Sequence, residues 1–125
     1  MTLPIVLTII FIHWVADFVC QAEVWATNKS KSNFALFKHV TMYTIIWSTG
    51  GVFIFSDPFK YLIFLLVTFV AHFTTDYFTS RIVSRKFANN EYGSPIPNFG
   101  AFTVIGFDQV LHYGQLFLTY HLLTN

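Results

Sequence analysis

Three pairs of histidine and aspartate recur along the chain, and all three have the same four-residue spacing. They are His13 with Asp17, His72 with Asp76, and Asp108 with His112. Residues four apart lie on one face of an α-helix, so each pair would place an imidazole beside a carboxylate. Histidine nitrogen and carboxylate oxygen both bind divalent metal ions, and the pairs are therefore candidates for a metal site.

The elements that carry these pairs are predicted to be membrane-spanning helices. The 125 residues are 54% hydrophobic and only 10% charged, whereas a soluble chain carries about 25% charged residues. So short a chain cannot enclose its sixteen Phe and three Trp in a water-soluble core. A net charge of +1 gives no field that would recruit nucleic acid. The single Cys20 excludes an internal disulfide and a cysteine-based zinc finger.

Four apolar stretches are long enough to cross the hydrocarbon core, which requires about 20 helical residues. The sequence predicts one all-α domain, residues 1–125, forming a polytopic four-helix transmembrane bundle with a polar His/Asp cluster inside. The expected spans are residues 3–22, 34–55, 58–81 and 102–123. Residues 23–33 are polar and are expected to hold a short interfacial helix. Ser56 and Asp57 predict a tight turn, and residues 87–100, which contain Pro, Gly and Asn, predict an irregular connection.

Basic residues predict how the bundle is oriented in a bacterial inner membrane. Six of the seven flank the first or third connection: Lys29, Lys31, Lys38, Arg81, Arg85 and Lys86. Only Lys60 lies on the other side. Because cytoplasmic flanks are enriched in Lys and Arg, these two connections are expected to be cytoplasmic, with both termini outside.

Alternating helix direction would bring the polar groups to matched depths. At about 1.5 Å of rise per residue, the three aspartates and His39 are expected about 7 to 9 Å below the cytoplasmic boundary. The histidines of the three pairs are expected about 14 Å deep. In the last pair Asp108 precedes His112, and this is the order that a helix of opposite direction requires to place both residues at the same depths as in the other pairs. A buried Asp costs about 2.5 to 3.5 kcal/mol in a span, so the cluster is interpreted as functional.

The expected chemistry is that of a metal-dependent hydrolase. The predicted metal ligands are His13, His72 and His112, joined by Asp17, Asp76, Asp108 and His39 as further ligands, as groups that orient the ligands, or as catalytic residues. Zn²⁺ is favoured, Mn²⁺ or Fe²⁺ would accept the same residues, and seven groups suit one ion or two. The expected substrate is a lipid-like ester or phosphoester at the cytoplasmic leaflet, with membrane lipids as partners.

Three other interpretations remain open. The pairs could serve only as hydrogen-bonded links between helices. The chain could instead be a non-enzymatic phage or bacterial membrane protein that binds a host membrane component, such as a host membrane protein. Alternating Asp and His could also carry ions or protons. Four spans form only a thin wall around a transport pathway, so this function would need a homo-oligomer.

The order of the motifs resembles a small integral-membrane family of unknown function found in bacteria and phages. The motifs are H-W-V-A-D-F-V-x-Q from His13, Trp25 with Lys29, His39, H-x3-D from His72, and F-D-Q-x2-H from Phe107. The resemblance covers nearly the whole chain and implies a membrane fold in which the His/Asp positions matter. Members often have Lys three residues after the third-span Asp, where this chain has Thr79. By analogy, the chain is similar to other small membrane-bound metal-dependent hydrolases.

Overall fold

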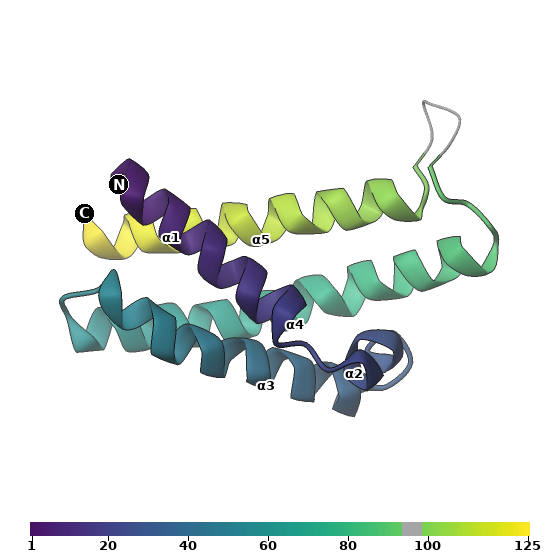
Figure 1. Ribbon diagram of the computed structural model, residues 1–125, viewed down its shortest axis with the longest axis horizontal. Coiled ribbons are helices and arrows are strands. Elements are labelled where there is room, and N and C mark those ends of the chain that lie inside the picture. Colours follow the sequence, from purple (N-terminus) through teal and green to yellow (C-terminus); the bar gives the residue numbers. More distant parts are fainter. Residues whose placement is uncertain (94–98) are drawn as a thin grey trace.

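The computed structural model describes residues 1–93 and 99–125, and every regular element in them is helical. The elements are α1 (Leu3–Trp14) with a π-helical turn (Val15–Val19), α2 (Glu23–Asn28), α3 (Asn33–Gly50) with a 3-10 turn (Gly51–Phe53), α4 (Pro58–Ala88) and α5 (Ala101–Thr124). Helices α4 and α5 lie side by side, α3 packs along α4, and α1 crosses the bundle obliquely (Figure 1). Within the predicted connection 87–100, residues 94–98 lie outside the described residues.

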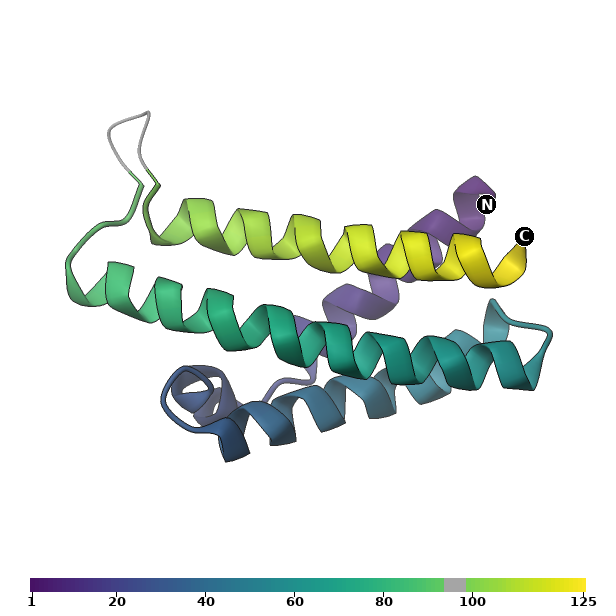
Figure 2. The same cartoon turned by 180° about the vertical axis from the view of Figure 1, so that it is seen from behind.

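Consecutive long helices run in opposite directions. Both termini and the turn between α3 and α4 lie at one end of the bundle, while α2 and the connection from α4 to α5 lie at the other (Figures 1 and 2). The first and third connections are therefore at the same end, as the alternation of the predicted spans requires.

Helix α4 begins where the sequence predicts but extends beyond the expected end at residue 81. Oδ1 of Asp57 accepts hydrogen bonds from the amides of Phe59 and Lys60, at 2.8 and 3.3 Å, which caps the first turn. The helix continues to Ala88 because basic residues in its last turn interact favourably with the negative end of the helix dipole. It stops before Asn90, which adopts a left-handed φ of 59° that Asn tolerates at helix ends.

Helix α1 is shorter than the expected span, and its last turn is widened. The amide of Cys20 donates to the carbonyl of Val15 at 2.9 Å, the five-residue spacing of a π-helix. Asp17 lies inside this turn. At Ala22 the backbone is extended, and α2 then occupies the first connection as the sequence predicts. Helix α3 also ends early, at Gly50, and a Cβ on the next residue, Gly51, would lie 2.7 Å from the Tyr61 ring.

Large apolar side chains cover the outside of the bundle, whereas ionisable side chains gather in its interior. Large apolar side chains are exposed on every long helix, among them Phe11, Phe34, Val70, Phe102 and Leu122. The apolar core is small and consists of Ile9, Ile12, Ala16, Tyr43, Trp47, Phe64, Leu116 and Tyr120. In the part of the chain that the structure describes, α4 alone has both the length and the hydropathy to span a membrane, and Leu3–Val19 is a shorter apolar segment. Four spans therefore stay a prediction.

Candidate metal centre

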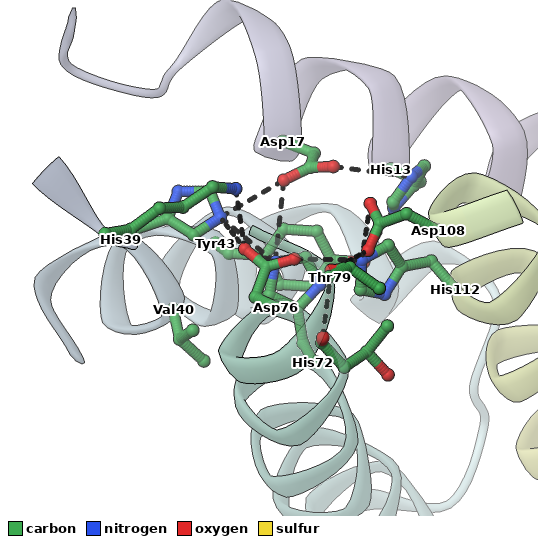
Figure 3. Close-up of polar contacts among 12 residues, drawn as sticks. His13, Asp17, His39, Val40, Tyr43, His72, Asp76, Thr79, Asp108 and His112 are labelled. Atoms are coloured by element: carbon green, nitrogen blue, oxygen red, sulfur yellow. Dashed lines mark hydrogen bonds and ion pairs between the residues drawn. The ribbon is translucent and has the colours of Figure 1, made fainter. Parts of the chain in front are cut away.

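All seven predicted site residues meet in one buried cluster (Figure 3). They come from four helices: His13 from α1, Asp17 from its π-helical turn, His39 from α3, His72 and Asp76 from α4, and Asp108 and His112 from α5. Each is between 0% and 9% exposed. The aromatic rings of the three deeper histidines are neighbours, since the His112 ring centre lies 4.2 Å from that of His72 and 5.5 Å from that of His13.

Four of these residues surround a common point. Nε2 of His39 lies 3.1 Å from Nε2 of His72, 3.2 Å from Oδ1 of Asp17 and 3.2 Å from Oδ2 of Asp76. Nε2 of His72 lies 3.5 and 3.7 Å from the same two oxygens. In a tetrahedral zinc site with bonds of about 2.0 to 2.1 Å, the ligand atoms are about 3.3 to 3.4 Å apart. This four-residue group therefore has the dimensions of a tetrahedral metal site.

Hydrogen bonding alone accounts poorly for the four-residue group. A ring nitrogen carries at most one proton, yet Nε2 of His39 faces three neighbours at almost equal distances. Oδ1 of Asp17 is buried without a hydrogen-bond partner in the described residues, although buried carboxylates are normally satisfied. A cation at the common point would satisfy all four atoms at once.

A second group shares Asp76 with the first. Nε2 of His112 lies 3.2 Å from Oδ1 of Asp76 and 3.3 Å from Oδ2 of Asp108. These three atoms also satisfy the spacing of metal ligands. Asp76 therefore directs one carboxylate oxygen to each group.

His13 lies beside the cluster but belongs to neither group. Its Nδ1 accepts a hydrogen bond from the Tyr43 hydroxyl, and its Nε2 donates one to Oε1 of Gln109, both at 2.8 Å. The Gln109 amide in turn donates to Oδ2 of Asp17 and Oδ2 of Asp108, at 3.3 and 3.1 Å. Both ring nitrogens of His13 are thus occupied. Its role as a metal ligand stays a prediction, and the geometry favours a role in positioning Gln109.

Tyr43, Gln109 and Thr79 complete the cluster, although none of them is among the seven predicted site residues. The Thr79 hydroxyl donates to Oδ1 of Asp108 at 2.6 Å. Tyr43 follows His39 by four residues and Thr79 follows Asp76 by three, so helical spacing could have found both. Gln109 belongs to the F-D-Q-x2-H motif, and its place beside Asp108 suggests a hydrogen bond within the cluster, although helical spacing turns it about 100° away.

Lys29 reaches the cluster from the connection that follows α2. Its Nζ lies 2.6 Å from Oδ2 of Asp76, the same oxygen that faces His39. Burial disfavours the ammonium, but the carboxylates of Asp76 and Asp17 outweigh burial and hold the pKa of Lys29 above its ordinary value. In the sequence, Lys29 is only a topology signal and part of a motif. The structure shows that it also lies in the cluster.

A cavity of about 450 Å³ opens beside the cluster. Its polar lining includes Asp17, Asp76, Asp108, Gln109 and Lys29. Oε1 of Gln21 and Oγ of Ser80, which are buried without a hydrogen-bond partner among the described residues, belong to two further lining residues. Apolar surface comes from Phe18, Val83, Phe87 and Ile105. The cavity thus has polar atoms next to the cluster and an apolar wall, a combination that suits an amphiphilic ligand.

A family model described as "Protein of unknown function (DUF3307)" matches residues 5–125, which include every residue of the cluster. The chain belongs to the DUF3307 family. No curated protein and no solved structure matches it. Membership agrees with the resemblance to a family of unknown function, but it supplies no activity. The function of this DUF3307 protein has to be argued from its cluster.

The charges of the cluster suit a divalent cation. With neutral imidazoles, as metal binding requires, three carboxylates and the Lys29 ammonium leave a net charge of about −2 in the buried site. One divalent ion would balance this charge, whereas uncompensated charge in a buried site is costly. The DUF3307 cluster could therefore hold a divalent metal, and its imidazole and carboxylate ligands are compatible with zinc, manganese or iron.

Proposed function

We propose that the protein is a four-span membrane protein that binds a divalent metal in its bundle and hydrolyses a lipid-like ester or phosphoester at the cytoplasmic leaflet. The observation that carries the proposal is the four-residue group, in which Nε2 of His39 faces three ligand atoms at 3.1 to 3.2 Å. Direct hydrogen bonds in the cluster range from 2.6 Å for Thr79 with Asp108 to 3.3 Å for Gln109 with Asp17, so distance alone does not identify an ion site. The convergence of three atoms on one ring nitrogen, which carries at most one proton, is the arrangement expected around an ion.

The exposure of large apolar side chains and the burial of ionisable ones support the membrane location. Phe53, Phe102 and Leu122 are between 64% and 85% exposed, while six of the seven cluster residues are no more than 4% exposed. Such a surface is stable in lipid, and ionisable groups in a span face the bundle interior. The orientation we propose has both termini outside the bacterial inner membrane and the two basic connections in the cytoplasm, which would place the cavity at the inner leaflet.

The proposed reaction uses water activated by a divalent ion held in the cluster. The water oxygen would bond to the acyl carbon or the phosphorus, the ester bond would break, and the proton lost by the water would pass to the departing alcohol. A bound divalent ion lowers the pKa of its water to about 7 and polarises the bond that breaks. Asp17, Asp76, Asp108 and His39 would act by holding the ion or by accepting that proton. We favour zinc, with manganese or iron as alternatives.

Elemental analysis of protein purified in mild detergent tests the metal. We expect at least one divalent ion per chain, a strong loss in His39→Gln, and no loss in His121→Gln. The second variant is a matched control because His121 is exposed at the end of α5. Wild-type protein that is purified without any bound metal would contradict the proposal.

Turnover is tested separately, with phospholipid in mixed micelles and detection of the released alcohol or phosphate. The expected result is hydrolysis that a chelator abolishes and that the added metal restores. Bound metal without turnover of any ester would instead favour the non-enzymatic membrane protein described above.

A further inference from the structure

We infer that the group formed by Asp76, Asp108 and His112 holds a second divalent metal ion, and that this ion binds a phosphate group in the cavity. The inference rests on the proposed function and narrows its substrate to a phosphoester. Asp76 would bridge the two ions, since Oδ2 faces the first group and Oδ1 the second.

The number of protein ligands separates the two positions. The four-residue group supplies two imidazoles and two carboxylates and so fills a tetrahedral site. The second group supplies three ligands, Asp76, Asp108 and His112. Structural metal sites are closed by four protein ligands, whereas catalytic sites have three and keep a position open for water or substrate. The second position is therefore the one able to take a ligand.

The spacing of the two groups fits a two-metal centre. His72 and His112 belong to different groups, and their rings stack at 4.2 Å between centres with 25° between planes. Each ring directs Nε2 to the carboxylate of Asp76. Metal ions in two-metal hydrolytic sites lie about 3.5 to 4 Å apart. Neighbouring imidazoles whose Nε2 atoms face opposite oxygens of one carboxylate are compatible with such a pair of ions.

The cavity and the charge indicate what binds there. The carboxylates of both groups, Asp17, Asp76 and Asp108, line the cavity, whereas the imidazoles of His39, His72 and His112 do not. With two divalent ions, three carboxylates and Lys29, the centre would carry a net charge of about +2 in a buried site. A phosphate group would compensate that charge, and an uncharged carboxylic ester would not. Lys29, Gln21 and Ser80 add polar atoms to the same cavity.

The number and coupling of the ions can be measured with manganese. Metal-free protein in detergent would be titrated with Mn²⁺, followed by elemental analysis and electron paramagnetic resonance. Wild-type protein is expected to bind two ions with an exchange-coupled spectrum. Asp108→Asn is expected to bind one ion with the spectrum of isolated Mn²⁺. Asp57→Asn, a matched change at an exposed helix cap, is expected to behave as wild type.

The outcomes separate this inference from the proposed function. One ion per wild-type chain, or two in Asp108→Asn, would overturn the second site and leave the first standing. Absence of any ion would overturn both. Should Asp108→Asn fail to fold, His112→Gln and the wild-type coupling decide the question. Two uncoupled ions in wild type would also contradict the bridge.

Phosphate binding is tested with ³¹P resonances in the presence of the manganese-loaded protein. Inorganic phosphate and short-chain phosphatidate micelles are the two probes. Paramagnetic broadening of either, lost in Asp108→Asn, supports the site, and the probe that broadens identifies a free phosphate or a lipid headgroup. If the resonances of both probes stay sharp, the phosphate assignment is overturned.

Discussion

Lys29 and a metal ion would compete for one oxygen of Asp76. The ammonium lies 2.6 Å from Oδ2, which is also one of the four converging ligand atoms. Two unit positive charges at about 4 Å repel by about 4 kcal/mol at an effective dielectric constant of 20, and a divalent ion doubles this repulsion. Metal binding in the four-residue group should therefore release Lys29 from Asp76 and leave its ammonium facing the cavity.

Removing this competitor should strengthen metal binding. We expect Lys29→Met to lower the metal dissociation constant by about tenfold, or about 1.4 kcal/mol, because part of the repulsion is already relieved when the flexible side chain moves away. Competition with a fluorescent chelator measures the constant. Lys31→Met is the matched control, since it removes an exposed charge from the same connection. Weaker binding in Lys29→Met would contradict the competition.

His13 should affect stability more than metal content. Its ring holds Gln109, which donates to both Asp17 and Asp108. Breaking this buried network is expected to cost about 1 to 3 kcal/mol. His13→Gln should therefore unfold at a lower temperature in detergent but keep its metal, whereas His72→Gln should lose metal. Loss of metal from both variants to the same extent would restore His13 as a ligand.

These residue-level results show what helical spacing can and cannot predict. Spacing indicates the six side chains of the three pairs, and expected depth adds His39. These seven gather in one cluster, because residues on facing sides at one depth meet in an antiparallel bundle. Spacing does not determine which ring nitrogen faces which neighbour, and His13 is oriented by Tyr43 and Gln109. It also says nothing of connections, so the contact of Lys29 with Asp76 was not predicted.

At the scale of the helices, the contact between Thr79 and Asp108 joins α4 to α5. The Thr79 hydroxyl oxygen lies 2.6 Å from Oδ1 of Asp108 and 2.9 Å from the carbonyl oxygen of Thr75, so its single proton is shared between two acceptors, of which Asp108 is the nearer. It therefore fixes the orientation of a carboxylate whose other oxygen faces His112. The family resemblance leads one to expect a Lys at this position, where this chain has a neutral hydroxyl. Lys29, which is itself part of the shared motifs, is the cation that contacts the cluster.

Thr79→Val should lower the free energy of unfolding by about 1 to 3 kcal/mol, because a buried carboxylate oxygen loses its donor. The measurement is denaturant or thermal unfolding in a fixed detergent. Thr74→Val is the control, because Thr74 is exposed on the same helix and bonds only to the carbonyl of Val70. Equal effects from the two variants would mean that the contact with Asp108 contributes little.

Helix boundaries were the least predictable feature at this scale. Hydropathy located the centres of the four long helices but placed the end of α4 near residue 81, whereas the helix continues to Ala88. Charged residues end an apolar stretch without ending a helix, and Arg85 and Lys86 favour its last turn. The π-helical turn that contains Asp17 has no sequence signature in the apolar run around it.

At the scale of the whole molecule, the two ends of the bundle differ in charge. Six of the seven basic residues lie at positions 29–38 or 81–86, beside the first and third connections, and they make that end basic. Lys60 lies in the first turn of α4, toward the end that holds both termini (Figure 1). The cavity belongs to the basic end, since Lys29 and Phe87 line it. Orientation in the membrane therefore determines which leaflet could supply a substrate.

Cysteine labelling in spheroplasts tests this orientation. In a Cys20→Ser background, Lys60→Cys should react with a membrane-impermeant maleimide from outside, whereas Lys31→Cys should react only after permeabilisation. The reason is that basic connections are retained in the cytoplasm. Both positions are exposed in the structure, so a permeant maleimide should label both and serves as the control. Labelling of Lys31→Cys alone from outside would reverse the topology and move the cavity to the outer leaflet, and a cytoplasmic phosphoester could then no longer be its substrate.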